Sequence, residues 1–233
     1  MLGSRLVKVA RTLESRSKER LALGIDALDE QLGGGLPVGA VTEIISEPGH
    51  GGWWLAMRAL AAIKGRMGLL NHDDSFHPPG AALHGVDLSR LLVVRVKEKK
   101  EALWALERLA KNASLDATYT WLPDLRDVEL RRLQLAAERS GQCVLLLRSE
   151  KEAGRASWGE LRLKVEGVPS DGPYFAKATS GRPRLIEVTT LRARGGMPRP
   201  VRIEVEHGTG AVRGAAVVPH RALDAEPRHA AGA

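Results

Sequence analysis

Residues 43–60 read EIISEPGHGGWWLAMRAL: an apolar strand pattern, a turn rich in Gly and Pro, and then an amphipathic helix pattern. A phosphate-binding loop has the pattern GxxxxGK[ST] at this place, directly before the helix. The eight corresponding residues here are Ser46, Glu47, Pro48, Gly49, His50, Gly51, Gly52 and Trp53. Gly51 keeps the second glycine, but Gly52 replaces the lysine and Trp53 replaces the hydroxyl residue that would bind magnesium. The stretch therefore predicts a degenerate phosphate-binding loop.

The composition is that of a globular protein with one large core. The chain has 233 residues, of which 43% are hydrophobic and 27% charged. No apolar run approaches the ~20 residues that span a bilayer, and the first residues contain no apolar signal segment. The single cysteine, Cys143, has no intrachain partner, which favours a reducing cytoplasm. The net charge of +7 favours an anionic partner.

Strand-length apolar runs alternate with helical patterns over most of the chain. We expect strands at 41–45, 67–70, 91–96, 117–122 and 142–147. We expect helices at 53–64, 101–111 and before Gly141, the last capped by Asp124 or Asp127. This alternation predicts an α/β fold, with a mainly parallel twisted sheet and helices on both faces. Alternating apolar and polar residues at 161–165, 185–189 and 201–205 predict C-terminal antiparallel strands.

The chain divides into three predicted segments. Residues 1–20 form a basic N-terminal arm, residues 21–218 form the core, and residues 219–233 form a flexible C-terminal tail. The stretch LGIDALDEQLGGGLPVGAVTEIISEPG (residues 23–49) resembles the opening of the RecA-type recombinase core, where a similar segment leads into the phosphate loop. ELRLKVE (160–166) and RLIEVTTLRARGGMPRPVRIEVEHGTG (184–210) resemble the closing strands of that core. The resemblance implies a RecA-like core of the P-loop type.

Within this superfamily the chain most resembles the ImuA family, RecA-like proteins encoded with bacterial translesion-synthesis cassettes and also described as SulA-like. Three stretches carry this resemblance: HPPGAALHGVDLSRLLVVR (77–95), LRDVELRRLQLAAERSGQCVLLLR (125–148) and LRARGGMPRP (191–200). The resemblance implies that the partner is ImuB, a catalytically inactive polymerase of Y-family type. It also implies an error-prone C-family DNA polymerase α subunit as a direct or indirect partner. RecA and DNA are further candidates.

The resemblance also implies that a second metal-handling position is lost. The Walker B strand of a RecA-like core ends in an aspartate, and the alignment puts Trp121 there. After the second strand, Asp73 or Asp74 corresponds to the general base, and the alignment does not choose between them. We therefore expect no cofactor and no catalytic residues. If the chain is an ATPase that binds ATP and magnesium weakly, Asp73 and Asp74 are its candidate catalytic residues, and Lys64 or an arginine would replace the missing lysine.

The stretch from Arg182 to Arg202 is rich in arginine, with Glu187 as its single acid. Its arginines can track nucleic-acid phosphates or dock on an acidic protein surface, and both uses stay open. They are Arg182, Arg184, Arg192, Arg194, Arg199 and Arg202. His72, Asp73, Asp74 and His77 superficially resemble metal ligands, but no second cluster accompanies them and we predict no metal site. Cys143 lies within a predicted strand and is expected to pack in the core.

Three functions remain as hypotheses. The leading one is a RecA-like adaptor of the error-prone translesion synthesis complex in the bacterial DNA-damage (SOS) response, with little or no catalysis. The second is a DNA-stimulated ATPase with a rewired phosphate loop. The third is a cell-division inhibitor of the SulA type. Under each hypothesis we expect a cytoplasmic protein without a membrane partner. Under the first hypothesis, the active protein would be associated with the nucleoid.

Overall fold

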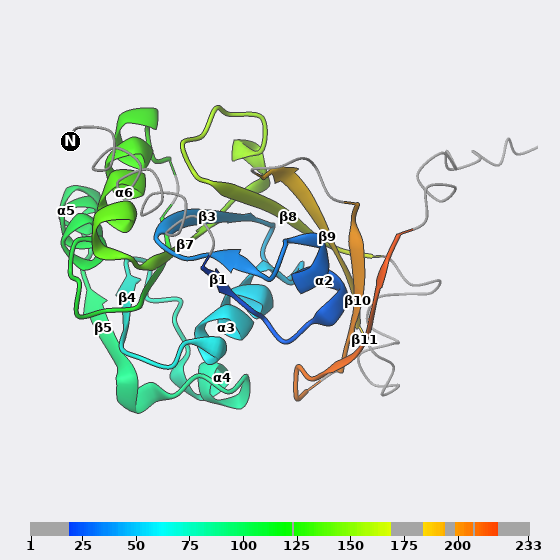
Figure 1. Cartoon of the computed structure of the whole chain (residues 1–233). Coiled ribbons are helices and arrows are strands. Elements are labelled where there is room, and N and C mark those ends of the chain that lie inside the picture. Colours follow the sequence, from blue (N-terminus) through cyan, green and yellow to red (C-terminus); the bar gives the residue numbers. More distant parts are fainter. Residues whose placement is uncertain (1–18, 123, 169–183, 194–198, 207, 219–233) are drawn as a thin grey trace, which may run out of the picture.

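The computed structural model describes residues 19–122, 124–168, 184–193, 199–206 and 208–218. Figure 1 shows the arrangement of the elements along the chain. The strands are β1 (Arg20–Leu21), β2 (Leu36–Pro37), β3 (Ala40–Ile45), β4 (Met67–Asn71), β5 (Leu91–Arg95), β6 (Ala117–Trp121), β7 (Cys143–Arg148), β8 (Leu161–Gly167), β9 (Arg184–Arg192), β10 (Val201–Val205) and β11 (Val212–Val217). The helices are α2 (Asp26–Gln31), α3 (Gly52–Ala62), α4 (Pro78–Leu83), α5 (Lys99–Ala110) and α6 (Asp127–Ser140), with short 3-10 turns η1 (Leu88–Arg90) and η2 (Glu150–Glu152).

Nine of the described strands form one sheet, in the order β11-β10-β9-β8-β3-β7-β6-β4-β5. The six strands from β8 to β5 are parallel to their neighbours, and β9, β10 and β11 add antiparallel pairs at the other end. The predicted α/β fold, with a mainly parallel sheet and C-terminal antiparallel strands, is confirmed.

Strand β8 differs from the prediction that residues 161–165 begin the antiparallel part. It pairs in parallel with β3, with Leu161 opposite Thr42, and antiparallel with β9. It is therefore an interior strand, and Leu161, Arg162 and Leu163 are all buried. The alternating pattern misleads because Arg162 is buried among charged partners and does not face water.

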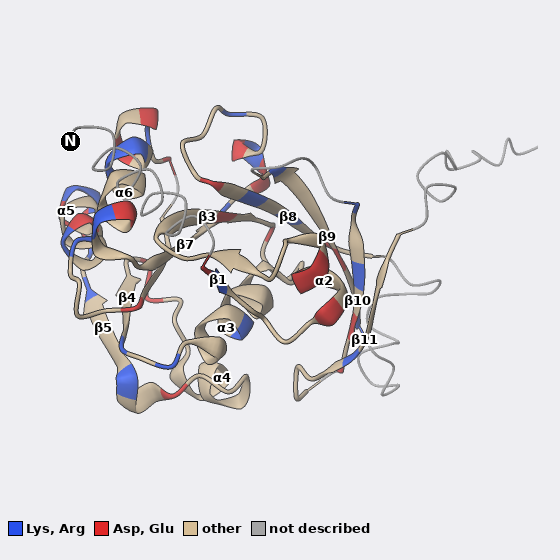
Figure 2. Ribbon diagram, in the orientation of Figure 1, with Lys and Arg blue, Asp and Glu red and all other residues tan. Residues whose placement is uncertain are grey.

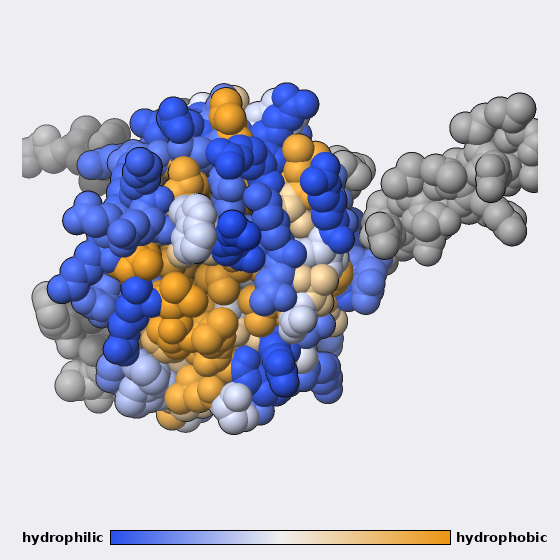
Figure 3. Space-filling model, turned by 90° about the vertical axis from the view of Figure 1, so that its left-hand side faces the viewer, coloured by the Kyte–Doolittle hydropathy of each residue, from blue (hydrophilic) through white to orange (hydrophobic). Residues whose placement is uncertain are grey.

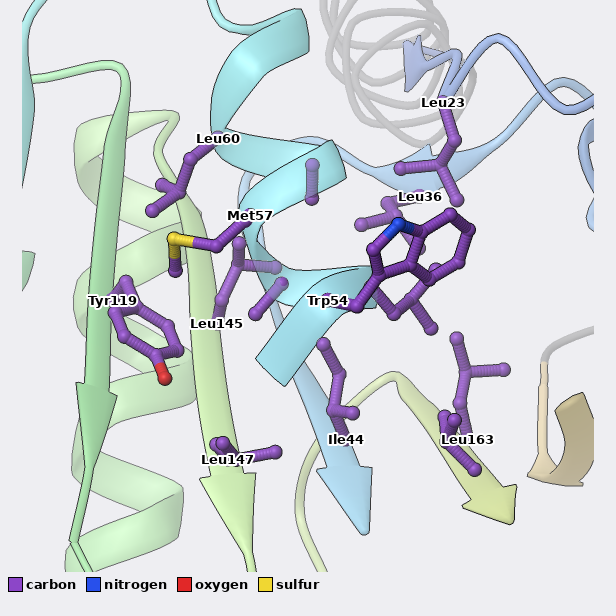
Figure 4. Close-up of a cluster of buried hydrophobic side chains, with 14 of the residues drawn as sticks. Leu23, Leu36, Ile44, Trp54, Met57, Leu60, Tyr119, Leu145, Leu147 and Leu163 are labelled. Atoms are coloured by element: carbon purple, nitrogen blue, oxygen red, sulfur yellow. The ribbon is translucent and has the colours of Figure 1, made fainter. Parts of the chain in front are cut away.

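Two hydrophobic cores lie on opposite faces of the sheet. Helices α2, α3 and α4 contribute to one, and α5 and α6 contribute to the other. On the first face, Trp54, Met57 and Leu60 of α3 pack over the central strands at Ile44 and Leu145, as Figure 4 shows. Trp54 thus belongs to the core, since only 6% of its surface is exposed. Its indole Nε1 donates to the carbonyl of Gly210, 2.8 Å away, which joins α3 to the turn before β11.

Short elements lie where the sequence analysis predicts no helix or strand. Helix α2 is one of them, and its Asp29 carboxylate accepts the backbone N–H of Leu23 at 2.9 Å. Gly35 has a positive φ of 115°, and a side chain there would collide with the carbonyl of Leu21. Helix α4 and strand β11 are also additions to the predicted set of elements.

The cap of α6 corrects a second prediction. The N-cap residue is Arg126, whose N–H donates to the Glu129 carboxylate at 2.8 Å, and neither Asp124 nor Asp127 caps the helix. Gly141 ends α6 with φ 81°, as predicted. Most of the predicted N-terminal arm (1–18) and the whole predicted tail (219–233) lie outside the described residues, although β1 already begins at Arg20. None of the described helices combines the length and apolar character that crossing a bilayer requires.

Candidate functional site

The loop between β3 and α3 has the backbone course that its sequence predicts. Ser46 to Gly51 connect the carboxyl end of a central parallel strand to the N-terminus of a helix. Gly49 and Gly51 have positive φ values of 83° and 105°. A Cβ on Gly51 would lie 2.8 Å from the Cγ2 atom of Ile186, so the close approach of β9 also requires this glycine. The scaffold of a phosphate-binding loop is therefore present.

The Ser46 side chain bonds the N-terminus of α3 to the neighbouring strand β8. This side chain is buried, and its Oγ accepts the backbone N–H of Gly52 at 3.2 Å and donates to the carbonyl of Val165 at 2.8 Å. A Cβ on Gly52 would collide with the Cβ of Ser46, and would lie 2.9 Å from Ser46 Oγ and 3.0 Å from Leu147 Cδ1, closer than a Cβ atom normally approaches. A lysine at position 52 therefore cannot be accommodated beside Ser46, and the Gly52 N–H is already bonded within the chain.

A pocket of about 380 Å³ lies beside the loop. Aromatic rings form much of its lining, with aliphatic and charged residues around them. The aromatic residues are Trp53, Trp54, Trp121 and His84; the aliphatic ones are Leu147, Ile186 and Val205; the charged ones are Glu47, Arg184 and Glu206. Such a lining suits an apolar or aromatic group better than the oxygens of a triphosphate.

Trp53 and Trp121 separate this pocket from the aspartates. Both tryptophans line the large pocket and also a second, smaller one that contains Asp73 and Tyr119. Asp73 accepts from the N–H and Oγ of Ser75 at 3.2 and 2.6 Å, which fixes it within its own turn. Burial, with a smaller contribution from Asp73, raises the pKa of Tyr119. The candidate base therefore lies across two indole rings from the loop.

Asp74 and Lys64, the predicted substitute for the missing lysine, also lie away from the loop and its pocket. Asp74 has φ 56°, in the left-handed region, and does not line the large pocket. Lys64 follows the end of α3, whose 11 residues span about 16 Å at 1.5 Å per residue. It lies at the opposite end of the helix from the loop. Among the candidate cations within the described residues, Arg184 is the one that lines the pocket.

The groups that superficially resemble metal ligands have other roles. His77 caps α4, accepting the N–H of Gly80 on its Nδ1 at 3.1 Å. Within the described part of the chain, no group of three His, Cys, Asp or Glu side chains is arranged to hold a metal ion. Cys143 is buried, and burial raises the pKa of its thiol to about 12. Cys143 therefore packs in the core.

Several residues of the pocket carry no signal in the sequence. His84 ends α4, and its ring meets the Trp53 ring edge to face, with centroids 5.2 Å apart. Burial, with Arg58 adding to it, lowers the pKa of His84. Glu206 and Gly210 come from the turn between β10 and β11. These segments are distant in sequence, and only the tertiary fold brings them to the loop.

Glu47 is held towards the segment after β7. Its carboxylate accepts the Oγ of Ser149 at 3.2 Å and the N–H of Glu150 at 3.0 Å. Since it also lines the pocket, its negative charge lies where phosphate oxygens would come. Glu47 therefore opposes the binding of an anion and at the same time stabilises the start of η2.

A buried charge cluster also holds the segment after β7 in place. It consists of Glu43, Arg148, Glu152 and Arg162, all buried. Arg148 pairs with Glu43 at 2.5 Å and with Glu152, and Arg162 pairs with Glu43 at 3.4 Å. Arg162 also donates to the carbonyls of Glu152 and Arg155, both at 2.9 Å. Two positive and two negative charges thus anchor residues 149–159 to three strands of the sheet.

The described arginines of the arginine-rich stretch lie apart from each other. Arg184 and Arg192 are at opposite ends of β9, and only Arg184 lines the pocket. Arg192 donates to the carbonyl of Ser157, Arg202 pairs with Glu187 at 2.8 Å, and the Arg199 N–H donates to Gln31 at 3.1 Å. Arg182 and Arg194 lie outside the described residues. Figure 2 shows basic residues of β8–β10 spread along the strands.

Comparisons with known proteins agree with this fold. The chain is 35% identical over 101 residues to Protein RecA of Crocosphaera subtropica, a match covering 42% of this chain and 29% of that protein. It is 33% identical over 101 residues to the DNA repair protein recA homolog 1, chloroplastic, of Arabidopsis thaliana, covering 42% of this chain and 23% of that protein. The matches thus span less than a third of these relatives. No protein-family model matches the chain.

The solved structure of the RadB recombinase has a similar fold. Its TM-score is 0.62 at 15% sequence identity, and the alignment covers 85% of this chain and 100% of that one. The chain therefore has a fold similar to that of RadB, with distant RecA-like sequence similarity over part of its length. The resemblance to the RecA superfamily is confirmed at that level.

Proposed function

We propose that this chain is a RecA-like accessory protein of the bacterial SOS response, an adaptor in the error-prone translesion synthesis complex. It binds ImuB and, directly or through ImuB, the error-prone C-family polymerase α subunit. RecA and DNA are further candidate partners, and the complex works in the cytoplasm on the nucleoid. The RecA-type fold and the three ImuA-like stretches of sequence support this role.

One observation carries the proposal: the Ser46 hydroxyl holds the Gly52 N–H in the cradle where a phosphate would bind. Trp53 and Trp121 stand at the two metal-handling positions, and Glu47 adds negative charge beside them. A RecA-type core with these features has no means of gripping magnesium-bound triphosphate. Its remaining use is as a rigid framework that presents surfaces to partners.

The edge strand β5 offers one such surface. It ends the described sheet order, and Leu92 on it is 52% exposed. Figure 3 views the side of the molecule on which β5 lies and shows a hydrophobic area bordered by hydrophilic residues. An exposed strand edge with apolar neighbours can pair with a strand of another chain. Protein binding thus has a physical basis that nucleotide binding lacks.

A pull-down with purified ImuB tests the role. We expect the intact chain to retain ImuB, and Leu92→Lys to reduce retention at least tenfold, because a charge would be introduced into the apolar edge. Ala216→Lys, on the exposed face of the opposite edge strand β11, is the matched control and should retain ImuB fully. A chain lacking residues 219–233 measures the contribution of the tail. Failure of the intact chain to bind ImuB would exclude the adaptor role.

The rival function is a DNA-stimulated ATPase, and Arg184 in the pocket is the observation in its favour. ATP binding and turnover, measured with and without single-stranded DNA, separate the two functions. We expect neither tight binding nor turnover. Turnover that disappears in the Asp73→Ala, Asp74→Ala double variant would establish the ATPase instead.

A further inference from the structure

The outer faces of α5 and α6 expose large apolar side chains. Trp104 on α5 is 63% exposed, and Val128 and Leu135 on α6 are 65% and 43% exposed. Trp158, in the segment after η2, is 46% exposed. Residues of this kind are usually buried, and four of them near one pair of helices form an unusual surface.

Two cation–π contacts hold the tryptophans against neighbouring arginines, and one ion pair joins the two helices. The Arg131 guanidinium lies 4.8 Å from the Trp158 ring centroid, and that of Arg108 lies 5.2 Å from the Trp104 centroid. Between them, Arg132 of α6 pairs with Glu107 of α5 at 2.9 Å. Val128, Arg131 and Leu135 follow the helical spacing of one face. We name Trp104, Arg108, Val128, Arg131, Leu135 and Trp158 the α5–α6 surface.

The helices that carry the α5–α6 surface expose more basic than acidic side chains. All eight Lys and Arg residues in 99–111 and 126–140 are exposed, but only three of the five acidic residues are. The other two, Glu107 and Glu129, are buried and each is paired with a basic side chain of the helices. Figure 2 shows basic residues on both α5 and α6. An occupant of this surface must therefore bring negative charge.

We propose that the α5–α6 surface binds an acidic segment of a partner protein that also carries aromatic or aliphatic side chains. Trp and Arg dominate the binding energy of protein interfaces, and here they alternate with aliphatic residues. Nucleic acid is the weaker candidate, because phosphates gain nothing from covering Val128 and Leu135. In addition, each tryptophan already has a guanidinium over its ring, which leaves less of the ring for a base to stack on.

The surface is preorganised, which favours binding. Trp158 belongs to the segment that the buried charge cluster anchors, with Ser157 donating to the Glu43 carboxylate. Arg131 and Val128 lie on a helix of 14 residues whose inner face is buried. Little conformational entropy is lost when rigid elements bind a partner. This inference goes beyond the proposed function, since neither ImuB nor the pocket enters it.

Selection from a random peptide library on the full chain tests the proposal. Peptides are counter-selected on the Val128→Ser, Arg131→Glu, Leu135→Ser triple variant, whose changes are all at exposed positions. We expect the enriched peptides to be acidic and to contain aromatic or aliphatic residues. The affinity of a selected peptide should fall about tenfold for Trp104→Ala and for Trp158→Ala, as truncation of an interface anchor typically gives.

Ala216→Ser is the matched control, because Ala216 is also exposed but lies on β11, at the opposite edge of the sheet. It should leave the affinity of the peptide unchanged, and circular dichroism should show every variant folded. Enriched peptides without acidic residues, or with equal affinity for the triple variant, would overturn the proposal. So would a 12-nucleotide single strand that binds this surface when no selected peptide does. An ImuB pull-down with the same variants tests the adaptor role separately from peptide binding by the α5–α6 surface.

Discussion

Replacing Gly52 by alanine tests whether Ser46 has taken the place of the phosphate. Gly52 is the first residue of α3, and alanine in a helix is normally more stable than glycine by about 0.5–1 kcal/mol. Here the new Cβ would collide with the Cβ of Ser46, and would lie 2.9 Å from Ser46 Oγ and 3.0 Å from Leu147 Cδ1. Overpacking of this kind costs about 1–3 kcal/mol, so we expect Gly52→Ala to lower the free energy of unfolding by about 1–2 kcal/mol.

The effect of Gly52→Ala on the free energy of unfolding should change sign when residue 46 is glycine. Ser46→Gly alone is destabilising by about 1–3 kcal/mol, because the Gly52 N–H and the Val165 carbonyl lose their buried partner. In that background the alanine Cβ meets only the end of the Leu147 side chain, which can move. We therefore expect Gly52→Ala to add up to about 1 kcal/mol there, a coupling of about 2 kcal/mol between the two positions.

Urea unfolding of the four proteins of this cycle, followed by tryptophan fluorescence, measures the coupling. Gly154→Ala is the matched control, because a Cβ at Gly154 has nothing within 4 Å and should not couple to Ser46→Gly. Additivity of Ser46→Gly and Gly52→Ala within about 0.5 kcal/mol would refute the reasoning. It would mean that the two residues do not compete for the same space, and that the cradle is not filled as described.

Three further perturbations follow from the described contacts. Arg148→Met leaves two buried carboxylates without their main partner. It should lower the free energy of unfolding, measured by urea titration, by about 3–5 kcal/mol. A loss near zero would contradict the role of the charge cluster in stability. Burial, with Arg58 adding to it, lowers the pKa of His84 below its ordinary value of 6.5, so the folded state resists protonation. Above pH 6.5 His84 should therefore not lower the free energy of unfolding, and the free energy should fall as the pH drops from 6.5 to the lowered pKa. His84→Gln should remove this fall, and an unchanged dependence of the free energy of unfolding on pH would contradict the prediction. Burial raises the pKa of Cys143 to about 12, so a thiol reagent should label the native protein far more slowly than the urea-unfolded chain, and equal rates would exclude its place in the core.

The parts of the site that follow from local sequence were predictable. A strand pattern, glycines at positive φ and an amphipathic helix specify the course of residues 43–60 whatever the rest of the chain does. Trp121 was placed correctly at the end of β6, because parallel strands bring their carboxyl ends to one edge of the sheet. The exchange of the lysine for glycine is likewise visible in the sequence.

The remaining features depend on tertiary contacts. His84, Glu206 and Gly210 reach the pocket from the end of α4 and from the turn before β11, and no spacing in the sequence relates them to the loop. Arg162 made β8 look half exposed, because a periodicity rule reads any arginine as facing solvent. Its burial depends on Glu43, which is more than a hundred residues away in the sequence.

The filled cradle and the anchored segment have a common energetic consequence. A nucleotide-binding core leaves N–H groups at its helix N-terminus for the ligand, and the bound ligand then adds to its stability by mass action. In this chain Ser46 bonds the Gly52 N–H, and Glu47 bonds the N–H of Glu150 in the segment after β7. The buried charge cluster holds that same segment without any ligand. Contacts within the chain therefore hold the segment that carries Trp158. The proposed adaptor would gain from this, because a surface that is fixed before binding loses less conformational entropy when a partner binds.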